Sequence, residues 1–150
     1  MTNSAMSKAI QIPRMLCHLH EAESLVHDVC AVIDMQPKQA YFVTLAVSEL
    51  ISNIVRHGVS RHCPDVVDMR LERLVDKLVI VVEDHCDALS ETVAARYQAT
   101  TDDAFSSSLT VEDCAESGWG VDLIASTATS VHYARLGERN RMEMQFDIKT

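Results

Sequence analysis

Two stretches of the chain alternate strictly between apolar and polar residues, and this alternation limits the folds that are open to it. Apolar residues take every second position in residues 67–71 and again in residues 142–148, with polar or charged residues between them. A turn at 76–77 leads into a more apolar strand at 78–82, and residues 130–136 fit the hairpin partner of the last strand. Such alternation predicts a largely antiparallel sheet with one wet face.

Helical patterns between these strands supply a second layer. Apolar residues recur at helical spacing over residues 20–33, after a short expected strand at 9–12. The longest helix candidate lies between Pro37 and Gly58, because proline favours the first turn of a helix and glycine favours its end. We expect the helices to cover one face, which gives an α+β fold, a two-layer α/β sandwich with a mixed, mostly antiparallel sheet.

The length, charge and cysteine pattern limit the class of protein. The 150 residues fit a single domain, 1–150, with an ordered core expected at about 9–148. The formal net charge of −9 argues against nucleic-acid binding, which needs a basic surface. No membrane-spanning run or secretory signal is evident, so we expect no membrane association and a cytoplasmic location. The five cysteines form no CxxC pair, which fits reduced thiols.

The long helix carries a polar stripe beside its apolar face. Glu49, Asn53 and His57 are four residues apart and therefore lie on one side of the helix. Polar side chains at the margin of a buried helix face can line a cleft while the helix stays packed. A solvated helix flank is the alternative, and spacing alone favours it because polar pairs with this spacing are common on helices.

Further features follow the long helix. The apolar strand at 78–82 leads to Asp84, and Gly118 and Gly120 stand at the start of a short apolar helix. Glycines allow a close approach of backbone to ligand, and the N–H groups of a helix start bind phosphate, although a plain loop-to-helix junction explains the pair equally well. Residues 89–117 hold little regular pattern beyond a possible short helix at their start, which is typical of a lid or of a disordered segment.

The order of these motifs resembles that of a known family. A helix with ExxxNxxxH, a strand that ends in Asp84, a long lid and a GxG that opens a helix resemble the GHKL ATPase superfamily, whose members share the Bergerat-type fold. The stretch VSELISNIVRHG, residues 47–58, looks most like the anti-sigma factor serine-protein kinase branch. The resemblance extends over nearly the whole chain.

The resemblance implies roles for individual residues. Glu49 corresponds to the general base that would deprotonate a serine hydroxyl, and Asn53 to the ligand of a phosphate-bridging Mg²⁺, which accepts amide oxygen. Asp84 corresponds to the aspartate that accepts a hydrogen bond from the adenine amino group. The other implied nucleotide-binding positions are His57, Cys86, Ala88, Gly118, Gly120 and Val121, with residues 89–117 as the ATP lid. His57 fits a helix-terminal packing residue equally well.

The implied function is that of an ATP-binding anti-sigma factor. Such a protein would bind a sigma factor and use ATP and Mg²⁺ to phosphorylate an anti-sigma-factor antagonist, a STAS-type protein, as a serine/threonine kinase. A homodimer is also expected. The alternative hypothesis is a non-catalytic partner-switching protein of the same fold, with weakened or lost nucleotide binding.

One motif departs from the family pattern. Where the family has DxGxG, this chain has Asp84 followed by Cys86 and Ala88 at the two glycine positions. If either position needs a positive φ, a Cβ there costs about 1 kcal/mol, so we expect weakened nucleotide binding. This departure favours the non-catalytic alternative, whereas the presence of Glu49 favours the kinase.

Two other hypotheses fit less of the sequence. A sensor histidine kinase needs a further helical hairpin that carries a phosphoacceptor histidine, and these 150 residues leave no room for it. A metal or redox regulator would use His62, Cys63, His85 and Cys86. These adjacent His-Cys pairs lack the chelating spacing of zinc sites, such as CxxC or HxxxH.

Overall fold

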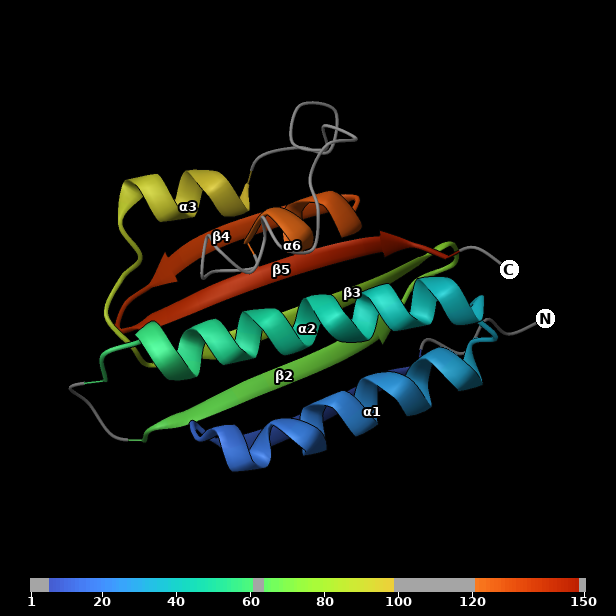
Figure 1. Ribbon diagram of the computed structural model, residues 1–150, viewed down its shortest axis with the longest axis horizontal. Helices are drawn as coiled ribbons and strands as arrows, with labels where there is room; N and C mark the ends of the chain where they lie inside the picture. The colour runs from blue at the N-terminus through green and yellow to red at the C-terminus, as the bar shows by residue number, and fades with distance from the viewer. Residues whose placement is uncertain (1–5, 61–63, 99–120, 149–150) are drawn as a thin grey trace.

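Five antiparallel strands form one sheet in the order β1-β2-β3-β5-β4 (Figure 1). The computed structural model describes residues 6–60, 64–98 and 121–148. The strands are β1 (Ser7–Pro13), β2 (Val66–Arg73), β3 (Lys77–Asp84), β4 (Ser130–Leu136) and β5 (Arg139–Asp147). The α+β class is confirmed. Within the described strands every pairing is antiparallel, so the sheet is less mixed than expected.

The helices lie on one face of this sheet (Figure 1). They are α1 (Leu19–Val32), α2 (Pro37–His57), α3 (Glu91–Tyr97) and α6 (Val121–Thr127), with a 3-10 turn at Leu16–His18 before α1. The helix α1 packs against α2, and α6 contacts both α2 and α3. In the part of the chain that the structure describes, no helix has the length and apolar character of a membrane span.

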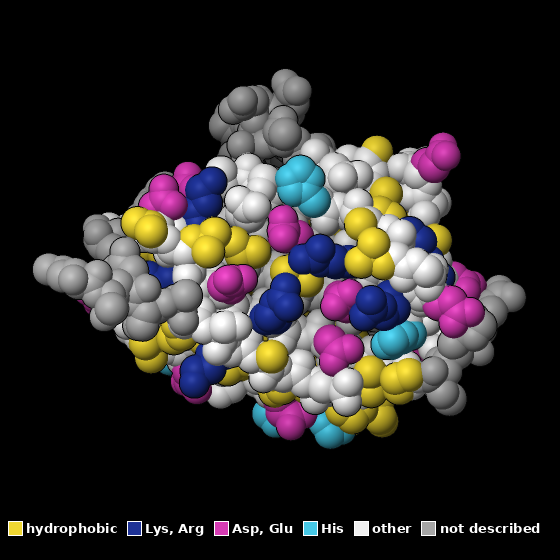
Figure 2. Space-filling view, turned by 180° about the vertical axis from the view of Figure 1, so that it is seen from behind, with side chains coloured by type: hydrophobic (Ala, Val, Ile, Leu, Met, Phe, Trp, Pro, Cys, Tyr) yellow, Lys and Arg dark blue, Asp and Glu magenta, His cyan; other side chains and the backbone are white. Residues whose placement is uncertain are grey.

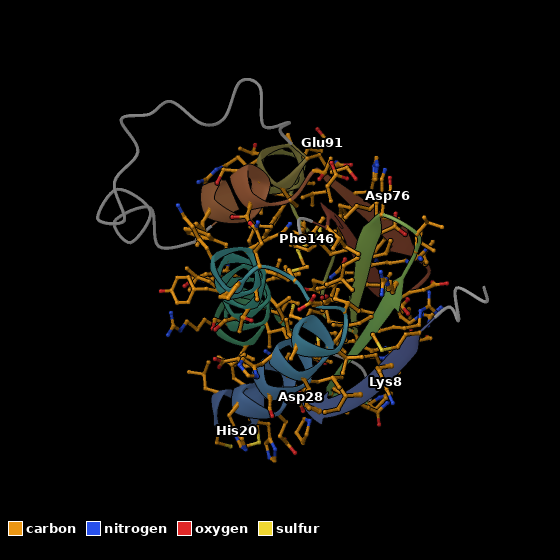
Figure 3. The ribbon with its side chains drawn as sticks, turned by 90° about the vertical axis from the view of Figure 1, so that its right-hand side faces the viewer. Lys8, His20, Asp28, Asp76, Glu91 and Phe146 are labelled. Carbon is orange, nitrogen blue, oxygen red and sulfur yellow. The ribbon has the colours of Figure 1, made fainter. Side chains whose placement is uncertain are left out.

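The two faces of the sheet differ in the way that the alternation predicts. Ile80, Met144 and Phe146 are buried, and Phe146 points into the space between sheet and helices (Figure 3). The opposite face carries side chains of both charge signs (Figure 2). Val81 lies on that face between its charged strand neighbours Arg70 and Glu143, so it is covered without a second layer of helices.

The predicted strands and helices are present, and their ends differ from the prediction by a few residues. The β4–β5 hairpin shows the reason, because β5 begins at Arg139, directly after a turn at Gly137 and Glu138. Gly137 has a φ of 62°, which suits the first central position of a two-residue hairpin turn. The tight turn extends the ladder to Asn140, beyond the part of the strand that the apolar alternation marks.

An arginine fixes the C-terminal end of α2. The Nη1 atom of Arg14 donates to three backbone carbonyl oxygens there, those of Ile54 (3.3 Å), Val55 (3.1 Å) and Gly58 (3.1 Å). The last carbonyl groups of a helix have no partner within the helix, and a cation there also meets the negative end of the helix dipole. Nε of Arg14 lies 2.6 Å from Oδ1 of Asp65, directly before β2, and this hydrogen bond raises the pKa of Arg14. The guanidinium therefore joins β1, α2 and β2.

We expect Arg14→Met to lower the free energy of unfolding by about 2–3 kcal/mol, because it removes a charged donor from the helix end. Urea denaturation followed by circular dichroism measures the change. Arg139→Met is the matched control, since Arg139 lies 3.6 Å from Glu83 in an exposed pair that contributes less than about 1 kcal/mol. Equal losses in the two variants would contradict the capping role.

Candidate functional site

A cavity of about 290 Å³ opens between the C-terminal half of α2, the end of β3 and α3. Five residues selected from the sequence line it, namely Asn53, His57, Asp84, Cys86 and Ala88. Its apolar wall includes Leu50, Ile54, Leu89, Val93 and Met142. Residues from the long helix and from the strand end therefore line one cavity.

The other predicted site residues lie elsewhere or outside the described residues. Glu49 is half-buried on α2, one turn before Asn53, and it is not part of the cavity lining. Gly118 and Gly120 lie outside the described residues, as does most of the predicted lid. Val121 begins α6, but its side chain is not described. The phosphate-binding half of the prediction therefore stays a prediction.

Asn53 is held by a tyrosine that the sequence did not reveal as a site residue. Its Nδ2 atom donates to the hydroxyl group of Tyr97 at 3.0 Å, and both side chains are buried. Burial, with smaller contributions from charges that include Asp84 and Glu49, raises the pKa of Tyr97, so the hydroxyl group stays protonated at neutral pH. This bond joins α3 to α2. The helical pattern that predicted α3 carries no signal of the contact with α2.

Asp84 ends β3 on the face that the helices cover, and it is 5 % exposed. Its Oδ1 atom accepts two hydrogen bonds of 2.9 Å, from the backbone N–H of Cys86 and from Nδ2 of Asn140. No N–H or O–H group of the described residues donates to the other oxygen, Oδ2; the weakly donating thiol of Cys86 also interacts with this carboxylate, and Asp84 lines the cavity. Since a buried carboxylate needs donors, Oδ2 is the acceptor that the cavity offers to an N–H group of a ligand.

Cys86 and Ala88 occupy the two expected glycine positions without backbone strain. Asp34 is the only non-glycine residue with a positive φ in the described part of the chain. Gly58 supplies the space that Cys86 needs, because a Cβ at residue 58 would lie 2.5 Å from its Sγ atom and 2.4 Å from the backbone oxygen of Ile54. The strain that would weaken nucleotide binding is therefore absent at both positions.

The described residues do not assemble the alternative metal site. No group of three or more His, Cys, Asp or Glu side chains among them is arranged to hold a metal ion. Burial raises the pKa of the Cys86 thiol to about 12. His62 and Cys63, the other members of that hypothesis, lie outside the described residues.

A network from the β4–β5 hairpin completes the cavity wall. Beyond its bond to the carboxylate, Asn140 donates to the backbone oxygens of Cys86 (3.3 Å) and Asp87 (2.9 Å). Its own oxygen accepts from the Tyr133 hydroxyl group (2.5 Å) and from Nη1 of Arg135 (3.1 Å). The sequence does hold a signal for Asn140, because the period-two pattern of the last strand places this polar residue on the inward face.

Solved structures of three other proteins have the same fold. The RsbU and RsbW domains of Rv1364c from Mycobacterium tuberculosis match with a TM-score of 0.63 and 12% identity, over 95% of this chain and 32% of that chain. The SiaB-SiaC complex from Pseudomonas aeruginosa matches with a TM-score of 0.60 and 14% identity, over 94% of this chain and 89% of that chain. The histidine kinase domain of a blue-light activated histidine kinase from Erythrobacter litoralis EL346 matches with a TM-score of 0.52 and 15% identity, over 91% of this chain and 62% of that chain.

These likenesses are ones of fold, and the chain spans only 32% of the first of those proteins. A search of curated proteins finds no match. The family model for the histidine kinase-like ATPase domain, however, matches residues 12–146, from the end of β1 to the last strand. The match includes α2, Asp84 and the whole cavity wall, and the protein therefore belongs to the histidine kinase-like ATPase domain family.

Proposed function

We propose that the protein binds Mg-ATP in this cavity and acts as an anti-sigma factor and serine-protein kinase that phosphorylates a STAS-type antagonist. The observation that carries the nucleotide part is the open Oδ2 atom of Asp84 at a cavity with a largely apolar wall. Adenine presents an amino donor and a flat apolar face, and a carboxylate is an acceptor only. Family membership supports the same ligand.

The described residues fit the base and the metal of this nucleotide. Leu50, Ile54 and Met142 offer an apolar surface to a base. The amide oxygen of Asn53 would hold Mg²⁺, which prefers oxygen ligands. When bound, Mg-ATP supplies the phosphoryl group for transfer, with the metal neutralising its charge.

Glu49 is the proposed general base, which would take the proton from the serine hydroxyl group of the antagonist. It lies one turn before Asn53 on α2 and is half-buried. Glu49 and Asn53 are four residues apart on α2 and therefore lie on the same side of the helix. A half-exposed carboxylate beside the cavity suits a substrate that arrives on another protein.

A non-catalytic partner-switching protein is the second candidate function. The observation that favours it is the position of Glu49 outside the cavity lining. In both candidates the chain binds a partner protein, which agrees with the fold of one similar structure, itself a complex of two proteins, SiaB and SiaC. The sigma factor and the homodimer remain proposals from the family resemblance.

We expect the protein to bind Mg-ATP, and Asp84→Asn to weaken that binding about tenfold to a hundredfold by calorimetric titration. The donors of Asn140 and Cys86 would keep the amide oxygen of the variant toward themselves, so its NH₂ group would meet the adenine amino group. Asp68→Asn is the control, because Asp68 lies on β2 between the buried Val67 and Met69 and therefore on the outer face of the sheet. Equal affinities for the parent and Asp84→Asn, or no binding at millimolar Mg-ATP, would refute the nucleotide site.

Glu49→Gln should reduce phosphoryl transfer from labelled ATP to a purified STAS-type antagonist by about 10²–10⁴-fold, because the amide cannot take the serine proton. Its affinity for Mg-ATP should stay at the parent value. Glu72→Gln, on β2, serves as the control for a loss of one negative charge. If the parent binds Mg-ATP but transfers no label to any such antagonist, the non-catalytic candidate is the correct one.

A further inference from the structure

Asn140 is a buried amide whose side chain is hydrogen-bonded to Asp84 at the end of β3, to the loop after β3 and to its own hairpin. It is the strand partner of Asp84 and is 5 % exposed. Nδ2 donates to Oδ1 of Asp84 and to two backbone oxygens, and Oδ1 accepts from Tyr133 and Arg135. Turning the amide over would place its oxygen against three acceptors, so the side chain has one stable orientation.

This orientation determines what Asp84 can offer to a ligand. One carboxylate oxygen, Oδ1, already accepts from Nδ2 of Asn140 and from the N–H of Cys86. Only Oδ2 is left for the cavity. Asp84 is therefore a one-oxygen acceptor, whereas a carboxylate with both oxygens free can bind two parallel donors.

The difference between one and two available oxygens separates the two purine bases. Adenine has a single exocyclic amino donor, next to ring nitrogens that accept. Guanine has an acceptor at that position, and its adjacent N1–H and N2 amino donors suit a carboxylate that accepts with both oxygens. A one-oxygen acceptor satisfies adenine but leaves a guanine donor without a partner, and an unpaired polar group strongly disfavours binding.

The same network holds the loop that carries Cys86 and Ala88. The Tyr133 hydroxyl group accepts from the backbone N–H of Leu89 at 3.1 Å. Nη1 of Arg135 donates to the backbone oxygen of Cys86 at 2.6 Å. Side chains of the β4–β5 hairpin therefore hold the backbone of this loop, in which Cys86 and Ala88 stand at the two glycine positions of the family pattern.

We propose that Asn140 is the positioning residue that makes the cavity select adenine over guanine nucleotides. It acts through Asp84 and through the loop at 86–89. Because this role rests on the proposed nucleotide binding, the affinity of the parent protein for Mg-ATP is measured first, and the variants are compared with it.

The test compares Mg-ATP and Mg-GTP affinities by calorimetry in the parent and in Asn140→Ala. We expect the parent to prefer ATP by at least about tenfold, and the variant to lose about tenfold in ATP affinity but less in GTP affinity. Met144→Ala, a core truncation on the same strand, should destabilise the fold yet keep the parent's preference. An unchanged ATP-to-GTP ratio in Asn140→Ala would overturn the selective role.

Hydrogen exchange tests the positioning role without nucleotide. In Asn140→Ala the amides of Cys86 and Leu89 should exchange about tenfold faster or more, with the Val82 amide of β3 unchanged. Tyr133→Phe removes the acceptor of the Leu89 N–H and only one of the two donors to the Asn140 oxygen, so it should accelerate Leu89 more than Cys86. Unchanged loop exchange in Asn140→Ala would overturn the positioning role. If the parent binds neither nucleotide, the proposed function and the base selection both fail, and the exchange rates alone decide whether Asn140 positions the loop.

Discussion

The guanidinium group of Arg14 at the end of α2 is the interaction on which the geometry of the cavity depends. Helix ends leave carbonyl groups without partners, and a single cation here donates to the carbonyl oxygens of Val55 and Gly58, shares that of Ile54 with the Gly58 N–H, and also pairs with Asp65 before β2. The last turns of α2 carry Asn53 and His57, so fixing this end fixes one wall of the cavity. The same group also connects the end of β1 and the start of β2 to that wall, so the position of the wall depends on these two strands as well as on α2.

The loop after β3 shows how a binding loop can keep its shape without the glycines of its family. Gly58, at the end of α2, leaves the space that the Cys86 side chain fills. Asn140, Tyr133 and Arg135 then hold the loop through hydrogen bonds from the opposite side. Contacts between distant segments thus hold this loop in place, which in the family motif is allowed by the backbone freedom of the glycines. The replacement of those glycines by Cys86 and Ala88 is therefore not by itself a sign that the binding site is lost.

The chemistry of the cavity is concentrated in a few polar groups within an apolar wall. Oδ2 of Asp84 is the acceptor, and Asn53 is hydrogen-bonded to the hydroxyl group of Tyr97, whose pKa is raised by burial. Such a site suits a flat, largely apolar ligand with one donor, since each buried polar group of the protein must find a partner. The carboxylate of Glu49 is on the same helix as Asn53 but does not line this cavity.

The sequence by itself determined the sheet, its two faces, the limits of α2 and the placement of Asn53 and Asp84, because these follow from the spacing of residues within one strand or helix. Only the tertiary structure established the pairs Arg14–Asp65, Gly58–Cys86, Asn53–Tyr97 and Asp84–Asn140. Periodicity predicts the face on which a side chain lies. It does not predict which residue of another segment meets it, because strand register and helix packing, set by the burial of the whole core, decide that.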